Sequence, residues 1–524
     1  MRTRMGNEWD TIIIGAGLGG LTAAAELVQS GRSVLLLERN PHPGGTAYVY
    51  NRRGFSFPMG PLGFSHPGIV RSILRDLKVE DDLPLHRVHY RIRAFGCDVP
   101  LTLPPAGMVR ALSERFPSDS RAVERFFQEM KAILSPSSHP EADTDCAAPG
   151  DLYRGSASEY LSRRIRDSRL RRILGSIGTR EPYSGLPLLA AMWNLMTEEG
   201  IWYPESGLKG FSERLAKRVT GRSDPEKATE VHGEIRLGTE VTHIRVENGK
   251  VAGVTLRDGS EIDSPSVISN ADYKTTFLRL LDRRKIPSQW NRAVNQARQT
   301  GSILQVCLGV DKGKADLSSF HEASRLIYRS GEAARTTEGI DWNAVEIDPG
   351  SLAKEELEIT LWSKEDELLA PEGKAVVVIR TEAEYSHFVR FRLGWRKRAP
   401  GYEAYKTRLG RALAREAENL IPGLEDSIQV MDVATPLTFE DQGGRSGGAV
   451  AGWSWDYEDF QGEEPRELIR TPIKGLFMAG YQAFSALFTG GIPTAMESGR
   501  RAAQAVLEGR SHGRNLDTRD EAAD

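Results

Sequence analysis

A glycine-rich turn between a strand and a helix, close to the amino terminus, limits most strongly how this chain can fold. Residues 10–14 (DTIII) are a short apolar run typical of a buried parallel strand. The motif GAGLGG follows directly at residues 15–20, and LTAAAELVQSG then predicts a helix that ends at Gly31. In such a G-x-G-x-x-G turn the first glycine allows a tight turn and the second lets the backbone approach a pyrophosphate. The third lets the helix pack closely on the strand.

The residues after this helix favour a dinucleotide-binding fold. A second strand is predicted over Ser33–Leu37, and Glu38 follows it, 23 positions after Gly15. A carboxylate at this place can accept hydrogen bonds from ribose hydroxyls, and the helix amino terminus offers N–H groups and a positive dipole end to the phosphates. An acid here favours FAD or NAD over NADP. The alternative is a fold of this class whose nucleotide site has lost its use.

Composition and charge exclude several other classes of protein. The 69 Lys and Arg residues nearly balance the 72 Asp and Glu residues, so nothing indicates a nucleic-acid partner. The three cysteines, Cys97, Cys146 and Cys307, are widely spaced and form no metal-binding motif or disulfide framework, which fits a reducing compartment. The start of the chain lacks an apolar signal core, and no apolar run approaches the roughly 20 residues that span a bilayer. We therefore expect a cytoplasmic protein that contacts membranes at most peripherally.

The block after the second strand separates FAD from NAD. A basic residue, Arg39, follows Glu38, and the pair Gly44-Gly45 comes shortly afterwards. With the following block GFSFPMGP (residues 54–61), this segment resembles the flavin amine oxidase and phytoene desaturase superfamily. Members usually carry Asp where this chain has Pro58.

Two later blocks resemble the same family in order and spacing. The first runs from YPESG (residues 203–207) through a helix and a strand meander over residues 234–269, with turns at Asn248-Gly249 and Asp258-Gly259, to SNAD. The second is the strand RTPIKGLFMAG, followed by TGGIP (residues 489–493) and a helix. The family normally shows Gly-Gly near the start of the first of these blocks, where this chain has Ser206-Gly207, and Asp after the Ala-Gly of the second, where this chain has Tyr481.

The resemblance implies an FAD site assembled from the three blocks. The backbone of Val241 is expected to pair with adenine, and the helix after Gly491 to stabilise negative charge on reduced flavin. The implied cofactor-binding residues are Gly15, Ala16, Gly17, Gly19, Gly20, Glu38, Arg39, Gly44, Gly45, Thr46, Met59, Gly60, Val241, Gly480, Tyr481, Gly491 and Ile492. No catalytic acid or base is identified.

The expected fold class is α/β, with a discontinuous Rossmann-type FAD-binding domain, an α+β substrate domain and a helical insert. The FAD-binding domain is predicted over residues 1–95, 203–274 and 441–510, and the substrate domain over residues 275–440. Residues 96–202 are predicted to form the helical insert, a candidate region for membrane contact and substrate entry. Residues 511–524 are a polar tail typical of disorder.

The resemblance implies an FAD-dependent oxidoreductase that acts on a long apolar polyene or isoprenoid. In a desaturation, a hydride passes to the flavin, a proton passes to solvent, and oxygen or a quinone reoxidises the cofactor. Two redox-neutral or reductive activities of the same family, carotenoid cis–trans isomerisation and saturation, stay open, as does a small-molecule or amine oxidase. A non-catalytic lipid-binding escort protein is the alternative from another class.

One segment suggests how an apolar substrate reaches the protein. Over Ser158–Ile177 the apolar residues fall on one helical stripe and six arginines surround it. An apolar face with a basic flank is typical of a helix that lies on an anionic membrane. The alternative is a helix whose stripe packs on the protein core.

Overall fold

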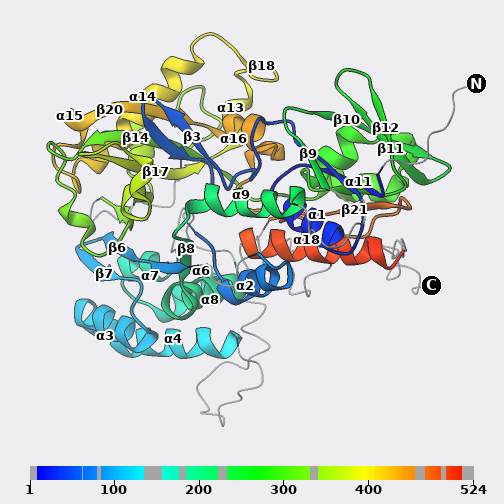
Figure 1. Ribbon diagram of the computed structural model, residues 1–524. Helices are drawn as coiled ribbons and strands as arrows, with labels where there is room; N and C mark the ends of the chain where they lie inside the picture. Colours follow the sequence, from blue (N-terminus) through cyan, green and yellow to red (C-terminus); the bar gives the residue numbers. More distant parts are fainter. Residues whose placement is uncertain are drawn as a thin grey trace, which may run out of the picture.

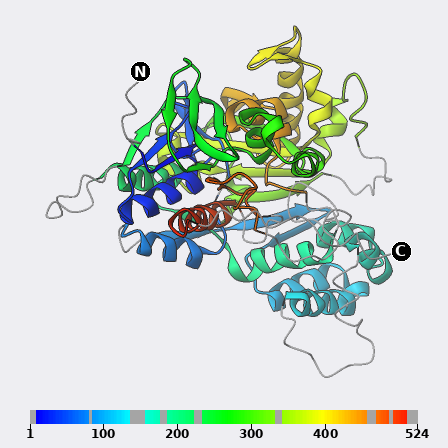
Figure 2. The same cartoon turned by 90° about the vertical axis from the view of Figure 1, so that its right-hand side faces the viewer.

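The computed structural model is built around two large sheets, with helices packed on them (Figures 1 and 2). It describes residues 9–61, 63–79, 84–134, 156–175, 185–221, 233–330, 340–454, 467–484 and 491–509. No helix in these ranges is long and apolar enough to cross a bilayer.

A five-stranded parallel sheet is built from segments far apart in the chain. Its order is β21-β13-β1-β2-β9, and every neighbouring pair is parallel. The strands are β1 (Thr11–Ile14), β2 (Val34–Leu37), β9 (Gly233–Arg236), β13 (Val267–Ser269) and β21 (Leu476–Met478). The residues of β1, β2, β13 and β21 are buried on both faces, as a parallel sheet covered by other layers requires, whereas the edge strand β9 is half-buried.

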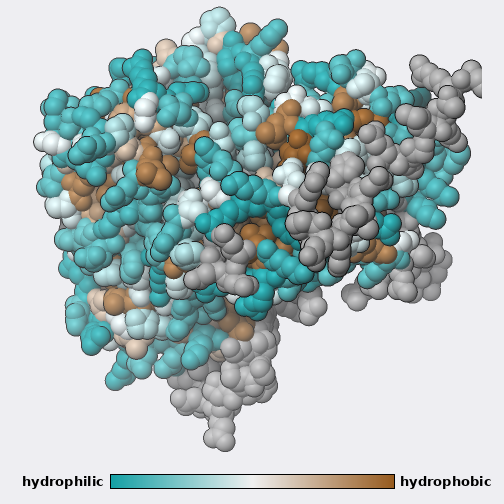
Figure 3. Space-filling model, viewed as in Figure 1, coloured by the Kyte–Doolittle hydropathy of each residue, from teal (hydrophilic) through white to brown (hydrophobic). Residues whose placement is uncertain are grey.

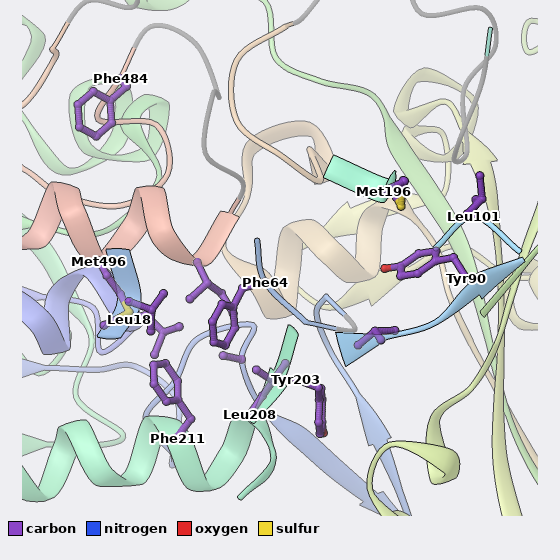
Figure 4. Packing of buried hydrophobic residues seen from close by; sticks show 14 of the residues in the cluster. Leu18, Phe64, Tyr90, Leu101, Met196, Tyr203, Leu208, Phe211, Phe484 and Met496 are labelled. Atoms are coloured by element: carbon purple, nitrogen blue, oxygen red, sulfur yellow. The ribbon is translucent and has the colours of Figure 1, made fainter. Parts of the chain in front are cut away.

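Helices cover one face of this sheet. They are α1 (Leu18–Gln29), α2 (Pro67–Asp76), α9 (Gly207–Thr220) and α18 (Gly491–Leu507). Helix α1 lies against both α18 and α9 (Figure 1). Figure 4 shows Leu18, Phe64, Met496 and Phe211 grouped between α18 and α9, where they belong to the largest buried cluster.

The other face of the parallel sheet carries a small antiparallel sheet and short helices. The sheet consists of β10 (Val241–Glu247), β11 (Lys250–Leu256) and β12 (Glu261–Asp263). After β13 the chain continues into α10 (Tyr273–Thr275), a turn over Thr276–Leu280, another over Arg283–Lys285 and α11 (Ser288–Gln296). The predicted meander over residues 234–269 was wrong in one respect. Its first and last strands, β9 and β13, pair with the parallel sheet instead of with β10–β12.

A seven-stranded mixed sheet forms the second unit, in the order β20-β14-β17-β16-β15-β6-β7. Its strands are β6 (Tyr90–Ala94), β7 (Cys97–Pro100), β14 (Ser302–Asp311), β15 (Arg325–Arg329), β16 (Leu357–Leu361), β17 (Lys374–Ala383) and β20 (Ile428–Ala434). One face packs on α14 (Tyr402–Ala417) through an apolar cluster that includes Leu304, Val306 and Ile379. The smaller elements are α12 (Pro349–Ala353), α13 (Tyr385–Val389), α15 (Leu424–Ser427), α16 (Pro436–Gly443), hairpin β18 (Arg392–Gly394) with β19 (Lys397–Arg398), and turns over Ser318–Phe320, Trp362–Lys364, Glu367–Leu369 and Ser446–Gly448.

A helical layer lies at the bottom of Figure 1 and packs on the β6–β7 end of the seven-stranded sheet through the largest buried cluster. Its helices are α3 (Pro105–Arg115), α4 (Ser120–Leu134), α6 (Ala157–Arg164), α7 (Ser168–Gly175) and α8 (Leu186–Asn194), with turns over Pro117–Asp119 and Leu195–Glu199. Two small antiparallel pairs of strands complete the fold: the hairpin of β3 (Val49–Arg52) with β4 (Phe55–Pro58), and β5 (Leu85–Val88) with β8 (Ile201–Pro204), which are far apart in the sequence.

The segment proposed for membrane contact is not one helix. It divides into α6 and α7, with Ile165 at the break, because the buried carboxylate of Asp119 accepts hydrogen bonds from the backbone N–H groups of Arg166 and Asp167, both at 3.0 Å. The described apolar residues of the stripe are buried: Leu161, Ile165, Leu170, Ile173 and Leu174. Ile177 lies outside the described residues. The stripe therefore packs on the core and cannot dock on a membrane.

These layers confirm the expected α/β fold class with a discontinuous nucleotide-binding unit. The division into domains stays a prediction, with one adjustment from the strand pairing. The predicted boundary between residues 95 and 96 falls in the turn of hairpin β6–β7, and β6 pairs with β15 of the seven-stranded sheet. Hairpin β6–β7 is thus part of the substrate sheet.

Asp119 offers a test of how the helical layer is held. Replacing it with Ala removes two hydrogen bonds to a buried carboxylate and leaves two backbone N–H groups without this acceptor, so we expect Asp119→Ala to lower the free energy of unfolding by about 2–4 kcal/mol. Chemical denaturation measures this value. Flavin content should not change, because Asp119 does not line the cavity described below. An unaltered midpoint of unfolding would contradict the role of Asp119 as the joint between α6 and α7.

Candidate active site

A cavity of about 440 Å³ lies where the parallel sheet, the meander and the seven-stranded sheet meet. The glycine-rich turn after β1 forms one wall, and β14 and β17 contribute Ile303, Gln305 and Arg380 to another. The cavity is therefore assembled from both sheets.

The glycine-rich turn brings backbone to the cavity where side chains have no room. A Cβ on Gly20 would stand 2.1 Å from the carbonyl oxygen of Gly15. A Cβ on Gly17 would stand 2.8 Å from the side-chain nitrogen Nδ2 of Asn270. Gly17 is the amino-terminal cap of α1, and it leaves the first N–H groups of this helix without a side-chain cap. The positive end of the α1 dipole is thus open to an anion in the cavity.

Glu38 stands at the end of β2 and lines the cavity although only 5% of it is exposed. One carboxylate oxygen accepts a hydrogen bond from the N–H of Ala16 and the other from the N–H of Asn40, both at 2.8 Å. Each oxygen keeps a second lone pair for a ligand hydroxyl. The side chain is therefore oriented before any ligand binds.

Fifteen of the seventeen residues selected from the sequence line this one cavity. They are Gly15, Gly17, Gly19, Glu38, Arg39, Gly44, Gly45, Thr46, Met59, Gly60, Val241, Gly480, Tyr481, Gly491 and Ile492. The other two, Ala16 and Gly20, are buried behind the wall. Gly20 packs α1 on β1, and Ala16 donates to Glu38. Their contribution is to the shape of the site, while the ligand contacts of all seventeen stay a prediction.

Three arginines line the cavity, Arg39, Arg380 and Arg445, and give its wall positive charge. Arg39 follows Glu38 and donates to the carbonyl of Asp441 at 3.2 Å. Arg445, from the loop after α16, donates to the hydroxyl of Thr46 at 2.9 Å and to the carbonyl of Val450 at 2.6 Å. Cations and a helix amino terminus in one cavity suit a diphosphate.

Sequence reasoning missed several parts of the wall. Helix α16 supplies Phe439, Gln442 and Gly443, and the loop after it supplies Gly444, Arg445, Val450 and Ala451. Asn270, at the end of β13, donates to the carbonyl of Gly15 at 3.3 Å. Asn270 had a signal in the sequence, the motif SNAD, but the loop with Arg445 had none that we recognised.

Tyr481 occupies the position where the family usually has a carboxylate. Its hydroxyl is buried and finds no hydrogen-bond partner among the described residues. The guanidinium of Arg445 lies 5.0 Å from the centre of its ring. Burial raises the pKa of Tyr481 to about 12, so the phenol stays protonated and offers the cavity a hydrogen-bond donor.

Aromatic residues that precede the second and third blocks in the sequence pack elsewhere, where the structure describes them. Trp193 packs edge-on against Phe126 and Phe127 of α4. Tyr203 is buried, and Trp453 belongs to the cluster under the meander. Trp455, Tyr457 and Phe460 lie outside the described residues. The three described side chains named here pack in the core and do not line the cavity.

The donor set fits FAD. A prepositioned carboxylate suits a ribose, uncapped backbone N–H groups and two arginines suit a diphosphate, and a buried phenol suits a polar edge of the flavin ring. We therefore test FAD as the ligand of this cavity.

Comparison with known proteins supports this interpretation. The family model described as flavin containing amine oxidoreductase matches residues 18–372. The chain is 26% identical over 514 residues to a chloroplastic prolycopene isomerase of Daucus carota, covering 91% of this chain and 77% of that protein. It is 25% identical over 452 residues to a lycopene-forming phytoene desaturase of Pseudescherichia vulneris, covering 82% of this chain and 86% of that protein.

A solved structure resembles the whole fold. An oxidoreductase from Methanosarcina mazei superimposes with a TM-score of 0.60 at 17% identity, covering 95% of this chain and 99% of that one. At this identity the likeness concerns the fold alone.

Glu38 tests the nucleotide end of the cavity. We expect Glu38→Gln to weaken FAD binding by about 1.5–3 kcal/mol, the scale of a hydrogen bond to a charged group. The amide keeps an oxygen that can accept one of the two backbone hydrogen bonds, so the protein should stay folded. Titration of FAD into apoprotein, followed by flavin fluorescence, measures the change. Equal affinity in variant and parent would exclude Glu38 as the ribose acceptor.

Gly491, the first residue of α18, tests the flavin end. Among the described residues a Cβ at this position meets no atom within 4 Å, so a larger side chain finds open space at the cavity wall. We expect Gly491→Val to fold normally and to lose flavin or to lower its reduction potential, because the side chain keeps the ring from the helix terminus. A visible spectrum and potential identical to those of the parent protein would show that α18 does not face the ring.

Proposed function

The chain belongs to the family of flavin-containing amine oxidoreductases, and on this premise we propose that it desaturates a long apolar polyene or isoprenoid. It is an FAD-dependent oxidoreductase that resembles phytoene desaturases. The observation that carries the proposal is the single cavity that collects most of the predicted cofactor-binding residues next to a wall supplied by the seven-stranded sheet.

We assign the parts of the cofactor to groups that line this cavity. Glu38 receives the ribose hydroxyls, and Val241, at the start of β10, takes the adenine. The amino terminus of α1, with Arg39 and Arg445, neutralises the diphosphate. We place the flavin ring against the wall that Gly60, Tyr481 and the residues of β14 and β17 form.

When bound, FAD supplies an acceptor for a hydride, that is, for one proton and two electrons. Loss of a hydride from an allylic carbon leaves the substrate with a cation spread along its conjugated chain, and the neighbouring C–H bond becomes acidic. Tyr481 and Arg380 line the cavity but remain protonated at neutral pH, so neither accepts that proton. Solvent takes it, which requires no dedicated base.

The relatives are named for two different reactions, desaturation and isomerisation, and an experiment has to decide which of them this protein catalyses. The phytoene desaturase supports net oxidation, whereas the prolycopene isomerase supports a redox-neutral reaction on the same class of substrate. Because a desaturase must dispose of two electrons per turnover, we include oxygen or a quinone as the acceptor.

A long polyene barely dissolves in water, so we also propose that the protein draws its substrate from a membrane surface. Helices α6 and α7 do not provide the contact, because their apolar residues are buried. On the face shown in Figure 3, hydrophobic residues form small groups separated by hydrophilic ones among the described residues. The contact must therefore be located experimentally.

Anaerobic mixing separates the activities. We expect purified protein to be yellow, with one FAD per chain, and to lose its flavin absorbance when phytoene in liposomes is added without oxygen, while the polyene spectrum shifts to longer wavelength. Oxygen or a quinone should then restore the flavin spectrum. Conversion of prolycopene at constant flavin absorbance would favour the isomerase. Colourless protein that takes up no FAD would contradict both and favour a non-catalytic lipid carrier.

A further inference from the structure

The segment between α13 and α14 carries positive charge and no negative charge of its own. Residues 386–402 (SHFVRFRLGWRKRAPGY) contain five Arg or Lys residues and no Asp or Glu. The centre of this segment is hairpin β18–β19, with a turn at Trp395 and Arg396. In Figures 1 and 2 the hairpin projects from the top of the molecule. It is therefore a basic element that solvent surrounds on several sides.

Two of the five basic residues hold the hairpin on the protein. Arg392 forms ion pairs with both Glu440 and Asp441 of α16. Arg398 pairs with Asp441 at 2.6 Å. At the base of the hairpin, Phe391 packs on two tyrosine rings of α14, with ring centres 5.5 and 5.6 Å apart. These contacts fix the position of the hairpin before any partner binds.

The other three basic side chains, Arg390, Arg396 and Lys397, point to solvent. All three are exposed, and none forms an ion pair with a described residue. The guanidinium of Arg390 lies 3.2 Å from Nε2 of His387, and Arg396 donates to the side-chain oxygen of Gln442 at 2.9 Å. Because the neighbours of these cations are uncharged, the cations are available to anionic groups outside the protein.

Two large apolar side chains stand among these cations. Leu393 is 67% exposed and Trp395 is 47% exposed. The guanidinium of Arg396 lies 4.4 Å from the ring centre of Trp395, and that of Arg257, which follows β11 and pairs with Glu240, lies 5.4 Å from it. A tryptophan flanked by cations, with an exposed leucine beside it, is typical of a surface that meets lipid head groups.

Burial separates this surface from the segment over residues 158–177, which carries a similar sequence pattern. There the described apolar residues pack in the core, so they cannot enter a membrane. Leu393 and Trp395 are in contact with water, and covering them removes apolar area from water. An anionic bilayer satisfies both parts of the surface, because its phosphates match the cations and its acyl chains accept the apolar side chains.

Helix α16 connects the hairpin to the cavity. Its residues Glu440 and Asp441 bind the hairpin, whereas Phe439 and Gln442 line the cavity. Gln442 belongs to both, since it also accepts the hydrogen bond from Arg396. A helix with its side chains is about 10 Å thick. A surface that meets the hairpin therefore lies within about one helix diameter of the cavity wall.

We propose that hairpin β18–β19 docks the protein on an anionic phospholipid membrane. Leu393 and Trp395 enter the boundary between head groups and acyl chains, and Arg390, Arg396 and Lys397 bind lipid phosphates. The inference rests on the proposed function, in which an apolar substrate is drawn from a membrane.

Flotation of FAD-loaded protein with vesicles tests the docking surface. One set of vesicles contains phosphatidylcholine alone, and the other mixes it with phosphatidylglycerol. We expect the parent protein to bind the mixed vesicles more tightly, and salt to weaken this binding. Protein that binds neither kind of vesicle overturns the proposal.

Two double variants separate charge from apolar contact. Arg396→Glu with Lys397→Glu should lower partitioning onto the mixed vesicles by at least about tenfold and remove most of the salt dependence, since each basic residue near an anionic surface contributes about fivefold. Leu393→Gln with Trp395→Gln should lower partitioning by about tenfold at every salt concentration, because salt does not screen apolar contact. Parent-like binding of both variants would exclude the hairpin as the docking surface.

Matched controls come from exposed residues outside the hairpin. Leu368→Gln changes a leucine that is more exposed than Leu393, in the turn over Glu367–Leu369, and Lys312→Glu reverses a charge in the turn after β14. Both should bind vesicles like the parent, and an equal loss in the controls would overturn the proposal. Lys397→Glu alone is the mildest change, because this side chain has no ion pair to lose, and it should still lower binding severalfold in folded protein.

The assay needs no turnover, so it distinguishes failure of this inference from failure of the proposed function. Yellow protein that oxidises a polyene in detergent but ignores vesicles excludes docking and leaves the oxidoreductase assignment intact. Protein that docks through the hairpin but reduces no flavin with any polyene supports the docking surface and contradicts the proposed reaction.

Discussion

Helices α1 and α18 pack so closely that their backbones are in direct contact, and the nucleotide-binding unit depends on that contact. A Cβ on Gly499 of α18 would stand 2.1 Å from the carbonyl oxygen of Gly19 in α1, and a Cβ on Gly19 would stand 2.8 Å from the carbonyl oxygen of Ala495. Glycine on both sides allows the two helices to approach this closely. The contact joins residues separated by almost the whole chain, and it sets the first and last elements around one cavity.

The cavity combines this rigid frame with charge that comes from elsewhere. The frame provides the uncapped amino terminus of α1 and the oriented carboxylate of Glu38. The guanidinium groups of Arg445 and Arg380 reach the cavity from the loop after α16 and from β17. Burying charged groups is costly unless they are paired, and each of these arginines donates to several acceptors. The electrostatics of the site are therefore fixed by the way the two sheets are joined.

Much of the fold follows from local patterns. The strand, glycine turn, helix and acid at the amino terminus were predicted within a few residues, because each step has its own steric or capping signal. Other patterns were ambiguous. Strands β9 and β13 alternate like those of the meander, yet they pair with the parallel sheet. The amphipathic stripe over α6 and α7 suited a membrane as well as a core, and Asp119, about 50 residues earlier in the chain, decides the break between the helices.

The sequence by itself determined that the glycine-rich turn and the acid after the second strand line one cavity, since glycines at fixed spacing and that acid carry the information locally. It did not determine that Arg445, Gln305 and Arg380 complete the same cavity. None of these residues has a neighbouring motif, and Arg380 lies more than 300 residues from the Gly60 carbonyl to which it donates. Nor could composition reveal that two arginines share Glu358. Strand register alone decides this, because pairing between β15, β16 and β17 brings the three side chains to one face of the sheet.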